Sequence, residues 1–170
     1  ERLDNVFNMK SPRPHGYDVV EAIHAMHEGR AKVFMAMGGN FISATPDTLY
    51  TAKALRNCDL TVHVSTKLNR SHLVDKDVIN GVHQFVSCEN SMGVVQSSKG
   101  NLHPVSDHLK SEPVIVCELA TTLFGADSVI PWNFYQQHYD HIRDIIAKVI
   151  PGFEDYNRKV RHPGGFYLPN

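Results

Sequence analysis

The chain has 170 residues, enough for one domain with a buried core. Hydrophobic residues make up 42 % of it and charged residues 21 %, which is typical of a folded globular protein and excludes a disordered one. Seventeen basic and eighteen acidic side chains leave a net charge of −1, so the composition gives no electrostatic argument for binding nucleic acid or an anionic membrane. No apolar run approaches the roughly 18 residues of a membrane span, and we expect none.

The chain opens with a segment that predicts little regular structure. Residues 1–16 contain two prolines and a glycine without any period, which predicts an irregular lead-in. Asp18 followed by Glu21 is typical of a capping box at a helix start, and Gly29 is expected to end that helix. Residues 32–37 (KVFMAM) are short and nearly all apolar, which predicts a buried parallel strand.

A Gly-rich turn separates this strand from a second helix. Residues 38–40 (GGN) break the strand, and residues 45–47 (TPD) combine a capping hydroxyl, a proline at the first helical position and an acid in the first turn. The expected inner face of that helix consists of Leu49, Ala52 and Leu55. Residues 60–66 (LTVHVST) predict the second strand. This order of elements is typical of the βαβ unit of an open α/β sheet.

The second half of the chain predicts mainly helices. Short strands at 84–88 and 93–96 are followed by a helix that Ser111 begins and Gly125 ends. Its expected apolar face consists of Ile115, Val116, Leu119 and Leu123. A long helix is expected from Pro131 to Pro151, then a short one over 153–161 and an extended tail over 163–170. The sequence therefore predicts one α/β domain over residues 1–170, with an open, mostly parallel, Rossmann-like sheet flanked by helices and extra helices in the C-terminal half.

Three cysteines, Cys58, Cys88 and Cys117, stand far apart without a C-x-x-C pair. Such a sparse, odd set predicts reduced thiols of a cytoplasmic protein, and excludes a disulfide framework or a zinc ribbon. None has a sequence context that lowers a thiol pKa, so we expect them to be buried and inert. The chain begins at Glu1 without an initiator methionine, and we interpret it as a piece of a longer protein.

Two strand ends are candidate ligand-binding positions, because ligands of open α/β sheets bind outside the carboxyl ends of the strands. The first strand is followed by Gly38, Gly39 and Asn40, and the second ends in Ser65, Thr66 and Lys67. Glycines allow close approach to the backbone, and a helix start at 45–47 would offer N–H groups to a phosphate. The G-x-G-x-x-G motif and the acid after the second strand that mark a nicotinamide site are both missing. The alternative is that the glycines form only a turn.

A dense polar run follows the second strand. In residues 65–73 (STKLNRSHL), the side chains of Lys67, Asn69, Arg70, Ser71 and His72 could together hold phosphates and a purine edge. The alternative, which the pattern alone favours, is a solvated loop followed by a short helix. Glu112, at an expected helix start, could accept hydrogen bonds from the N1–H and N2–H₂ groups of guanine, although an acid there is also an ordinary partner of the helix dipole.

The sequence offers no catalytic residue. The pairs His24/His27 and His138/His141 share helix faces, but neither belongs to an H-E-x-x-H motif, so we expect no metal site there. A G-x-S-x-G nucleophile elbow is missing as well, which leaves a serine hydrolase without its nucleophile.

Five segments carry a resemblance to a known family. The runs KVFMAMGGNFISATPDT (32–48) and LTVHVSTKLNRSHLV (60–74) resemble the molybdopterin oxidoreductase superfamily, and most of all its formate-dehydrogenase-like alpha subunits. Residues 88–100, 109–120 and 152–170 resemble the same subfamily. The resemblance covers most of the chain, in order.

The resemblance implies a large multidomain enzyme that oxidises a small, formate-like substrate. Its cofactor would be molybdenum or tungsten held by two molybdopterin guanine dinucleotides, with a 4Fe-4S cluster elsewhere in the parent protein. This chain would be one of two α/β domains that each hold one dinucleotide, with the remaining domains of the same polypeptide as its partners. The metal ligand and the general acid or base would lie outside it, so we assign no catalytic residue here and expect the isolated fragment to be inactive.

The resemblance also assigns contacts. The turn of Gly38, Gly39 and Asn40 would touch the dinucleotide, and Ser65 and Thr66, with Lys67 beside them, would reach ribose or guanine. The implied groove continues along Asn69, Arg70, Ser71 and His72, and Glu112 would bind guanine. The chain departs from the family between Val74 and Gly81, where relatives have a further apolar strand and a Gly-Arg-Thr-Glu loop. Two alternatives remain open: a nucleotide-binding or subunit-docking module that has lost the cofactor, and an ordinary NAD-binding domain.

Overall fold

The computed structural model describes residues 1–64, 78–79, 82–99, 106 and 108–169. They form two compact units. We call Pro12–Asn69 the small unit, and Glu1–Ser11 together with Arg70–Asn170 the large unit.

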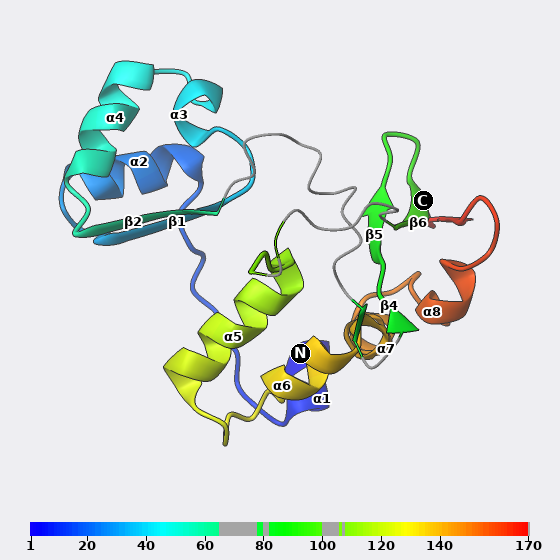
Figure 1. Ribbon diagram of the computed structural model, residues 1–170. Coiled ribbons are helices and arrows are strands. Elements are labelled where there is room, and N and C mark those ends of the chain that lie inside the picture. Colours follow the sequence, from blue (N-terminus) through cyan, green and yellow to red (C-terminus); the bar gives the residue numbers. More distant parts are fainter. Residues whose placement is uncertain (65–77, 80–81, 100–105, 107, 170) are drawn as a thin grey trace. The chain divides into compact units, whose positions relative to one another are not determined.

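The small unit is a βαβ arrangement, as the sequence predicts. Strands β1 (Val33–Met37) and β2 (Leu60–Val64) pair in parallel, with Val33 opposite Leu60 and Met37 opposite Val64. Helices α2 (Val19–His27) and α4 (Thr48–Arg56) lie on the same side of this pair (Figure 1). The core between them contains the buried residues Ile23, Met26, Ala54 and Leu55, with Phe34 of β1 packed against them.

The start of α2 confirms the predicted capping box. The Glu21 backbone N–H donates to Asp18 Oδ1 at 2.8 Å, and the Asp18 N–H donates to Glu21 Oε2 at 3.4 Å. Gly29 follows the helix with φ +72°, a left-handed conformation that favours glycine.

The second helix begins later than predicted. A short helix, α3 (Phe41–Ala44), follows the glycine turn directly, and α4 begins at Thr48, where Asp47 is the cap and accepts from the Tyr50 N–H at 2.9 Å. The predicted capping residue Thr45 is buried instead, and its hydroxyl bonds the Ile42 carbonyl at 3.0 Å and the Thr51 hydroxyl at 2.9 Å. Asp47 therefore caps the helix in place of Thr45.

The predicted inner face of α4 was also partly wrong. Leu55 is buried as expected, but Leu49 is 77 % exposed, and Thr51 and Ala54 supply the rest of the buried surface. Thr51, Ala54 and Leu55 face the core, and Leu49 lies on the outer side of the helix.

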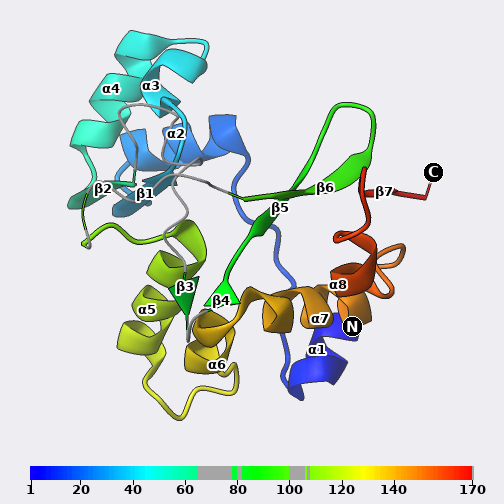
Figure 2. The same cartoon turned by 45° about the vertical axis from the view of Figure 1, so that its right-hand side comes forward.

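The large unit combines helices with antiparallel strands (Figure 2). Its main sheet has the order β5-β6-β7, and β3 and β4 form a separate antiparallel pair. The strands are β3 (Val78–Ile79), β4 (Val82–His83), β5 (Val86–Glu89), β6 (Val94–Ser98) and β7 (Phe166–Tyr167). The helices are α1 (Arg2–Phe7), α5 (Glu112–Phe124), α6 (Trp132–Gln137), α7 (Tyr139–Val149) and α8 (Tyr156–Lys159).

Three predictions for this unit need correction. Residues 2–7 form α1, although the prolines and the glycine further along predicted an irregular segment. The long helix expected from Pro131 is interrupted at His138, which is extended (φ −157°, ψ 123°) and caps α7 by accepting from the Asp140 N–H at 3.2 Å. The expected apolar face of α5 is largely exposed; the buried residues of that helix are Cys117 and Ala120.

The fold is α/β, as predicted, and the C-terminal half holds the extra helices. The expected mostly parallel sheet is limited to the β1–β2 pair among the described residues, because the other strands pair antiparallel. Within the described part of the chain, no helix combines the length and the apolar character needed to cross a membrane.

Candidate functional site

The glycine turn lies at the carboxyl edge of the parallel pair. The Gly38 backbone N–H donates to the carbonyl of Val64, the last residue of β2, at 2.8 Å. Gly38 and Gly39 both have left-handed backbones, with φ +70° and +66°, and Asn40 follows as the cap of α3. All three residues are exposed. The turn therefore sits next to the end of the neighbouring strand, where a ligand of a parallel sheet is expected.

The surface above Gly39 is open. A Cβ placed on this residue would meet no atom of the described residues within 4 Å. Gly165 in the large unit is the opposite case, because a Cβ there would lie 2.0 Å from the Val95 carbonyl oxygen. Packing therefore requires glycine at position 165, whereas at position 39 it leaves free space beside the backbone.

The side-chain oxygen of Asn40 already accepts a hydrogen bond. Its Oδ1 accepts from the Ser43 N–H at 3.4 Å, as the cap of α3. Toward a ligand, Asn40 can therefore act as a donor through its amide nitrogen. This suits phosphate or carbonyl oxygens, which accept hydrogen bonds.

The predicted phosphate position at residues 45–47 is wrong. The Asp47 carboxylate already caps the N-terminus of α4, and it would repel an anion placed there. Of the ligand contacts predicted after the first strand, only those of Gly38, Gly39 and Asn40 remain as candidates.

Seven of the predicted contact residues lie outside the described part of the chain: Ser65, Thr66, Lys67, Asn69, Arg70, Ser71 and His72. The departure expected between Val74 and Gly81 falls mostly outside it as well. Ser65 directly follows Val64, whose carbonyl bonds Gly38. Glu112 is described: it is exposed and is the first residue of α5, in the large unit, whereas the glycine turn belongs to the small unit.

The histidine pairs have aromatic partners. His24 Nδ1 lies 3.0 Å from the Tyr50 hydroxyl, and the His27 ring stacks on Tyr50 with centroids 4.6 Å apart. His138 caps α7, and the His141 ring stacks on Phe134 at 3.8 Å. Among the residues that the structure describes, no group of three or more His, Cys, Asp or Glu side chains could hold a metal ion.

The cysteines only partly match the expectation. All three thiols are free, and burial raises the pKa of Cys117. Cys88 is exposed, however, so the expectation that every thiol is buried was wrong. It lies on β5, whose side chains are mostly exposed.

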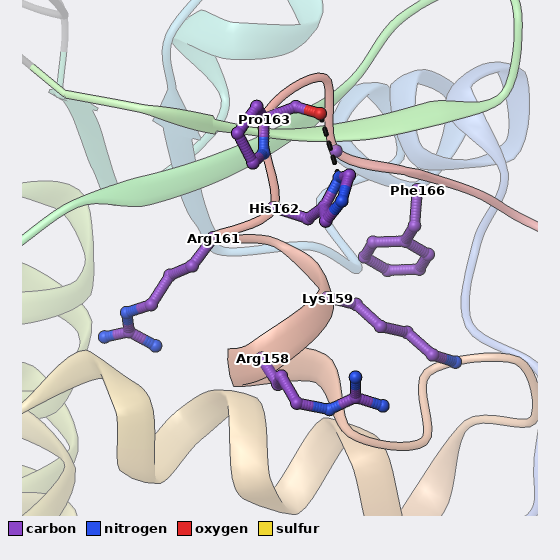
Figure 3. A pocket seen from close by; sticks show the side chains of 7 residues that line it. Arg158, Lys159, Arg161, His162, Pro163 and Phe166 are labelled. Carbon is purple, nitrogen blue, oxygen red and sulfur yellow. Dashed lines mark hydrogen bonds between the residues drawn. The ribbon is translucent and has the colours of Figure 1, made fainter.

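A basic pocket in the large unit was missed by the sequence reasoning (Figure 3). It measures about 520 Å³. Its lining residues are Arg158, Lys159, Arg161, His162, Pro163, Gly165 and Phe166. The sequence feature that could have predicted this pocket is the run of four basic residues within positions 158–162.

Acidic neighbours balance the charge of this pocket. Arg158 pairs with Asp155 at 2.8 Å, and Arg161 bonds both carboxylate oxygens of Asp140 at 2.7 and 2.9 Å. Figure 3 shows Arg161 directed away from Arg158. The cations do not converge on one point, so we do not assign an anion site to this pocket.

Asp140 is the centre of an ion network that includes the pocket residue Arg161. It receives hydrogen bonds from Arg161 and from Arg143, which is only 4 % exposed and also donates to the Phe85 carbonyl at 3.0 Å and to Asn157 Oδ1 at 2.7 Å. Partial burial acts to raise the pKa of Asp140, but the bonds from the two arginines outweigh it, and the pKa lies below its usual value. The network joins α7 to α8 and to the chain before β5, which is a structural role.

Comparison with known proteins gives two informative relatives. A protein of Mycobacterium tuberculosis (strain H37Rv), named an uncharacterized oxidoreductase, is 54 % identical over 182 residues, which cover 99 % of this chain and 23 % of the relative. Protein YdeP of Escherichia coli (strain K12) is 37 % identical over 183 residues, which cover 99 % of this chain and 24 % of that protein. Both alignments exceed the 170 residues of this chain, so the relatives carry residues that it lacks.

No family model and no solved structure matches the chain. The chain spans about a quarter of the length of the curated relatives it matches. Over nearly all of its residues, it is similar to one part of a larger protein that is named an oxidoreductase.

Proposed function

We propose that this chain is the part of a larger oxidoreductase that holds one guanine dinucleotide of a molybdopterin cofactor. The observation that carries the proposal is the glycine turn, which lies exposed at the carboxyl edge of a parallel strand pair and has open space above Gly39. The resemblance of five segments to formate-dehydrogenase-like subunits supports it, and so does the name of the mycobacterial relative.

The residues present fit such a group in a specific way. Gly38 and Gly39 would let a pyrophosphate approach the backbone, and Asn40 would donate a hydrogen bond through its amide nitrogen. Ser65, Thr66 and Lys67 would follow at the adjoining strand end, and Glu112 would accept from guanine. When bound, the molybdenum or tungsten centre supplies two-electron redox chemistry to the parent enzyme. The residues of this chain bind and orient the dinucleotide.

The parent protein is proposed to act on a small, formate-like substrate in the cytoplasm and to pass electrons to a 4Fe-4S cluster in another domain. Its remaining domains would supply the catalytic groups. A module that lost its cofactor is the competing proposal, and an NAD-binding domain is the weaker one.

The test uses the full-length parent protein with single substitutions. We expect Asn40→Ala, Ser65→Ala and Glu112→Gln each to lower the amount of guanine nucleotide released per protein. Glu28→Gln is the control, because Glu28 is an exposed acid that pairs with Arg30 at 2.7 Å and has no proposed ligand. Unchanged nucleotide content in the three variants would reject the site, and binding of NAD without guanine nucleotide would favour the NAD-binding domain.

A further inference from the structure

Ser111, the residue that precedes α5, has an unusual partner for a helix cap. A serine in this position ordinarily accepts a hydrogen bond from a backbone N–H in the first turn. Within the part of the chain that the structure describes, the Ser111 side chain makes no such bond. Its hydroxyl instead bonds the hydroxyl of Tyr139, the first residue of α7 and 28 positions further along the chain. The start of α5 is therefore tied to the start of α7 within the large unit.

Tyr139 is a fixed anchor for this bond. Its side chain is buried, with the residue only 2 % exposed, and its backbone N–H donates to Gln84 Oε1 at 3.0 Å. Gln84 precedes β5 and is itself only 4 % exposed. A buried tyrosine hydroxyl normally has a hydrogen-bond partner, and Ser111 provides one here. Packing and the bond to Gln84 thus set the position of the phenol that holds Ser111.

Glu112 directly follows the residue that Tyr139 holds. It is exposed and is the first residue of α5. The nearest basic residue along the chain, Lys110, forms an ion pair with Glu118 inside α5. Among the residues that the structure describes, none forms a hydrogen bond or ion pair with the Glu112 side chain. Its carboxylate is thus available to a ligand, while the backbone beside it is held by Ser111.

We propose that Tyr139 is a positioning residue for Glu112: its hydroxyl holds Ser111 and so fixes the helix start that directs the Glu112 carboxylate to the guanine base. The inference rests on the proposed function, because it takes Glu112 as the acceptor for the N1–H and N2–H₂ groups of guanine. Two hydrogen bonds to one carboxylate require a defined direction, since each weakens steeply when its angle departs from linear. A helix start that is already fixed also avoids the cost of ordering it on binding.

The test measures how long the full-length protein retains its guanine nucleotide during dialysis. Tyr139→Phe keeps the buried ring and removes the hydroxyl. We expect the half-time of nucleotide loss to shorten by about fivefold, the effect of one average hydrogen bond on a binding constant. Ser111→Ala should shorten it equally, and Ser111→Thr, which keeps a hydroxyl, should retain the wild-type half-time.

Tyr156→Phe is the matched control. Tyr156 is also a buried tyrosine of the large unit, 6 % exposed, and its hydroxyl bonds the Ser87 hydroxyl at 2.6 Å. This bond does not involve the start of α5, so its removal should leave the half-time unchanged. An equal shortening in Tyr156→Phe would mean that general loss of packing causes the effect, and would overturn the proposal.

The double variant Tyr139→Phe/Glu112→Gln separates positioning from a purely structural role. If Tyr139 acts through Glu112, Tyr139→Phe has no further effect once Glu112 is changed. A further shortening of about fivefold in the double variant would overturn the proposal.

The single variants distinguish failure of this inference from failure of the proposed function. If Glu112→Gln shortens the half-time but Tyr139→Phe and Ser111→Ala do not, the positioning role is rejected and the guanine contact stands. If Glu112→Gln has no effect, the guanine contact itself is rejected, and this inference with it.

Discussion

The backbone N–H of Gly38 donates a 2.8 Å hydrogen bond to the carbonyl of Val64. This bond continues the parallel pairing one residue beyond β1 and fixes the glycine turn against the end of β2. The strand pairing therefore holds the turn in place while the space beside Gly39 stays clear of the described residues.

The open space above Gly39 leads to a prediction for Gly39→Asn. Asparagine tolerates the left-handed backbone, so the turn should persist while the new side chain fills the space where we place the dinucleotide. Steric overpacking costs about 1–3 kcal/mol. We therefore expect the metal and guanine nucleotide content of the full-length protein to fall clearly.

Gly29→Asn is the matched control for this change. Gly29 has a similar φ of +72° and follows α2, away from the proposed contact. Equal losses of cofactor in both variants would mean that backbone strain, and not the space above Gly39, causes the effect.

Gly165→Ala should destabilise the large unit. A Cβ at this position would lie 2.0 Å from the Val95 carbonyl oxygen, which must move and disturb the pairing of β6 with β7. We expect a loss of about 3 kcal/mol in the opening free energy of the β6 amides, measured by hydrogen exchange. Gly164→Ala has a comparable φ of +88°, but its Cβ meets no atom within 4 Å in the described part of the chain, and the change should cost about 1 kcal/mol. Similar losses in the two variants would contradict the role of the close contact.

Asp140 should make the large unit sensitive to acid. A carboxylate whose pKa is lowered by folding stabilises the folded state above its unfolded pKa of about 3.9, and this contribution is lost as the pH falls through the lower, folded pKa. Asp140→Asn removes the charge that faces buried Arg143 and should cost about 3 kcal/mol at neutral pH. The variant should then lose less stability than the wild type on acidification.

This pH dependence is checked by hydrogen exchange of the α7 amides, corrected for intrinsic rates. Asp155→Asn is the comparison, because Asp155 and Arg158 form an exposed pair with side chains 65 % and 79 % exposed. Exposed ion pairs contribute about 0–1 kcal/mol to the free energy of unfolding. If Asp140→Asn behaves like Asp155→Asn, the buried network does not stabilise the unit.

Substitution of the two leucines of α4, Leu49 and Leu55, tests whether the observed or the predicted face of this helix is buried. Leu55→Ala removes a residue that is 7 % exposed and should lower the opening free energy of the α4 amides by about 2–5 kcal/mol. Leu49→Ala changes a residue that is 77 % exposed, and should alter the opening free energy of the same amides by about 0.5 kcal/mol or less. A large effect of Leu49→Ala would instead support the face expected from the sequence.

The sequence predicted the elements whose signals are local. The capping box of Asp18 and Glu21, the apolar run of β1 and the alternation in β2 depend on neighbouring residues alone, and the structure confirms the capping box and both strands. The prediction that β1 is buried was wrong, because Val33 is 63 % exposed and Met35 41 %. The glycine turn was also predicted from a local signal, the residues Gly38, Gly39 and Asn40 that directly follow the strand.

The remaining differences depend on contacts that the sequence pattern does not show. The Thr45 hydroxyl bonds Thr51 while Asp47 caps α4, and at the helix break His138 Nδ1 accepts a hydrogen bond from the Asp140 backbone N–H. The ion network around Asp140 joins residues up to 58 positions apart, such as Arg143 and Phe85, and no local pattern predicts it.

The central claim is that the parent protein holds a molybdenum or tungsten cofactor with guanine dinucleotides, one of them on this chain. The most direct measurement is elemental and nucleotide analysis of the full-length protein, purified from its own host without air. We expect close to one molybdenum or tungsten per chain and two guanine nucleotides released per metal. A protein without either metal and without bound guanine nucleotide would contradict the claim.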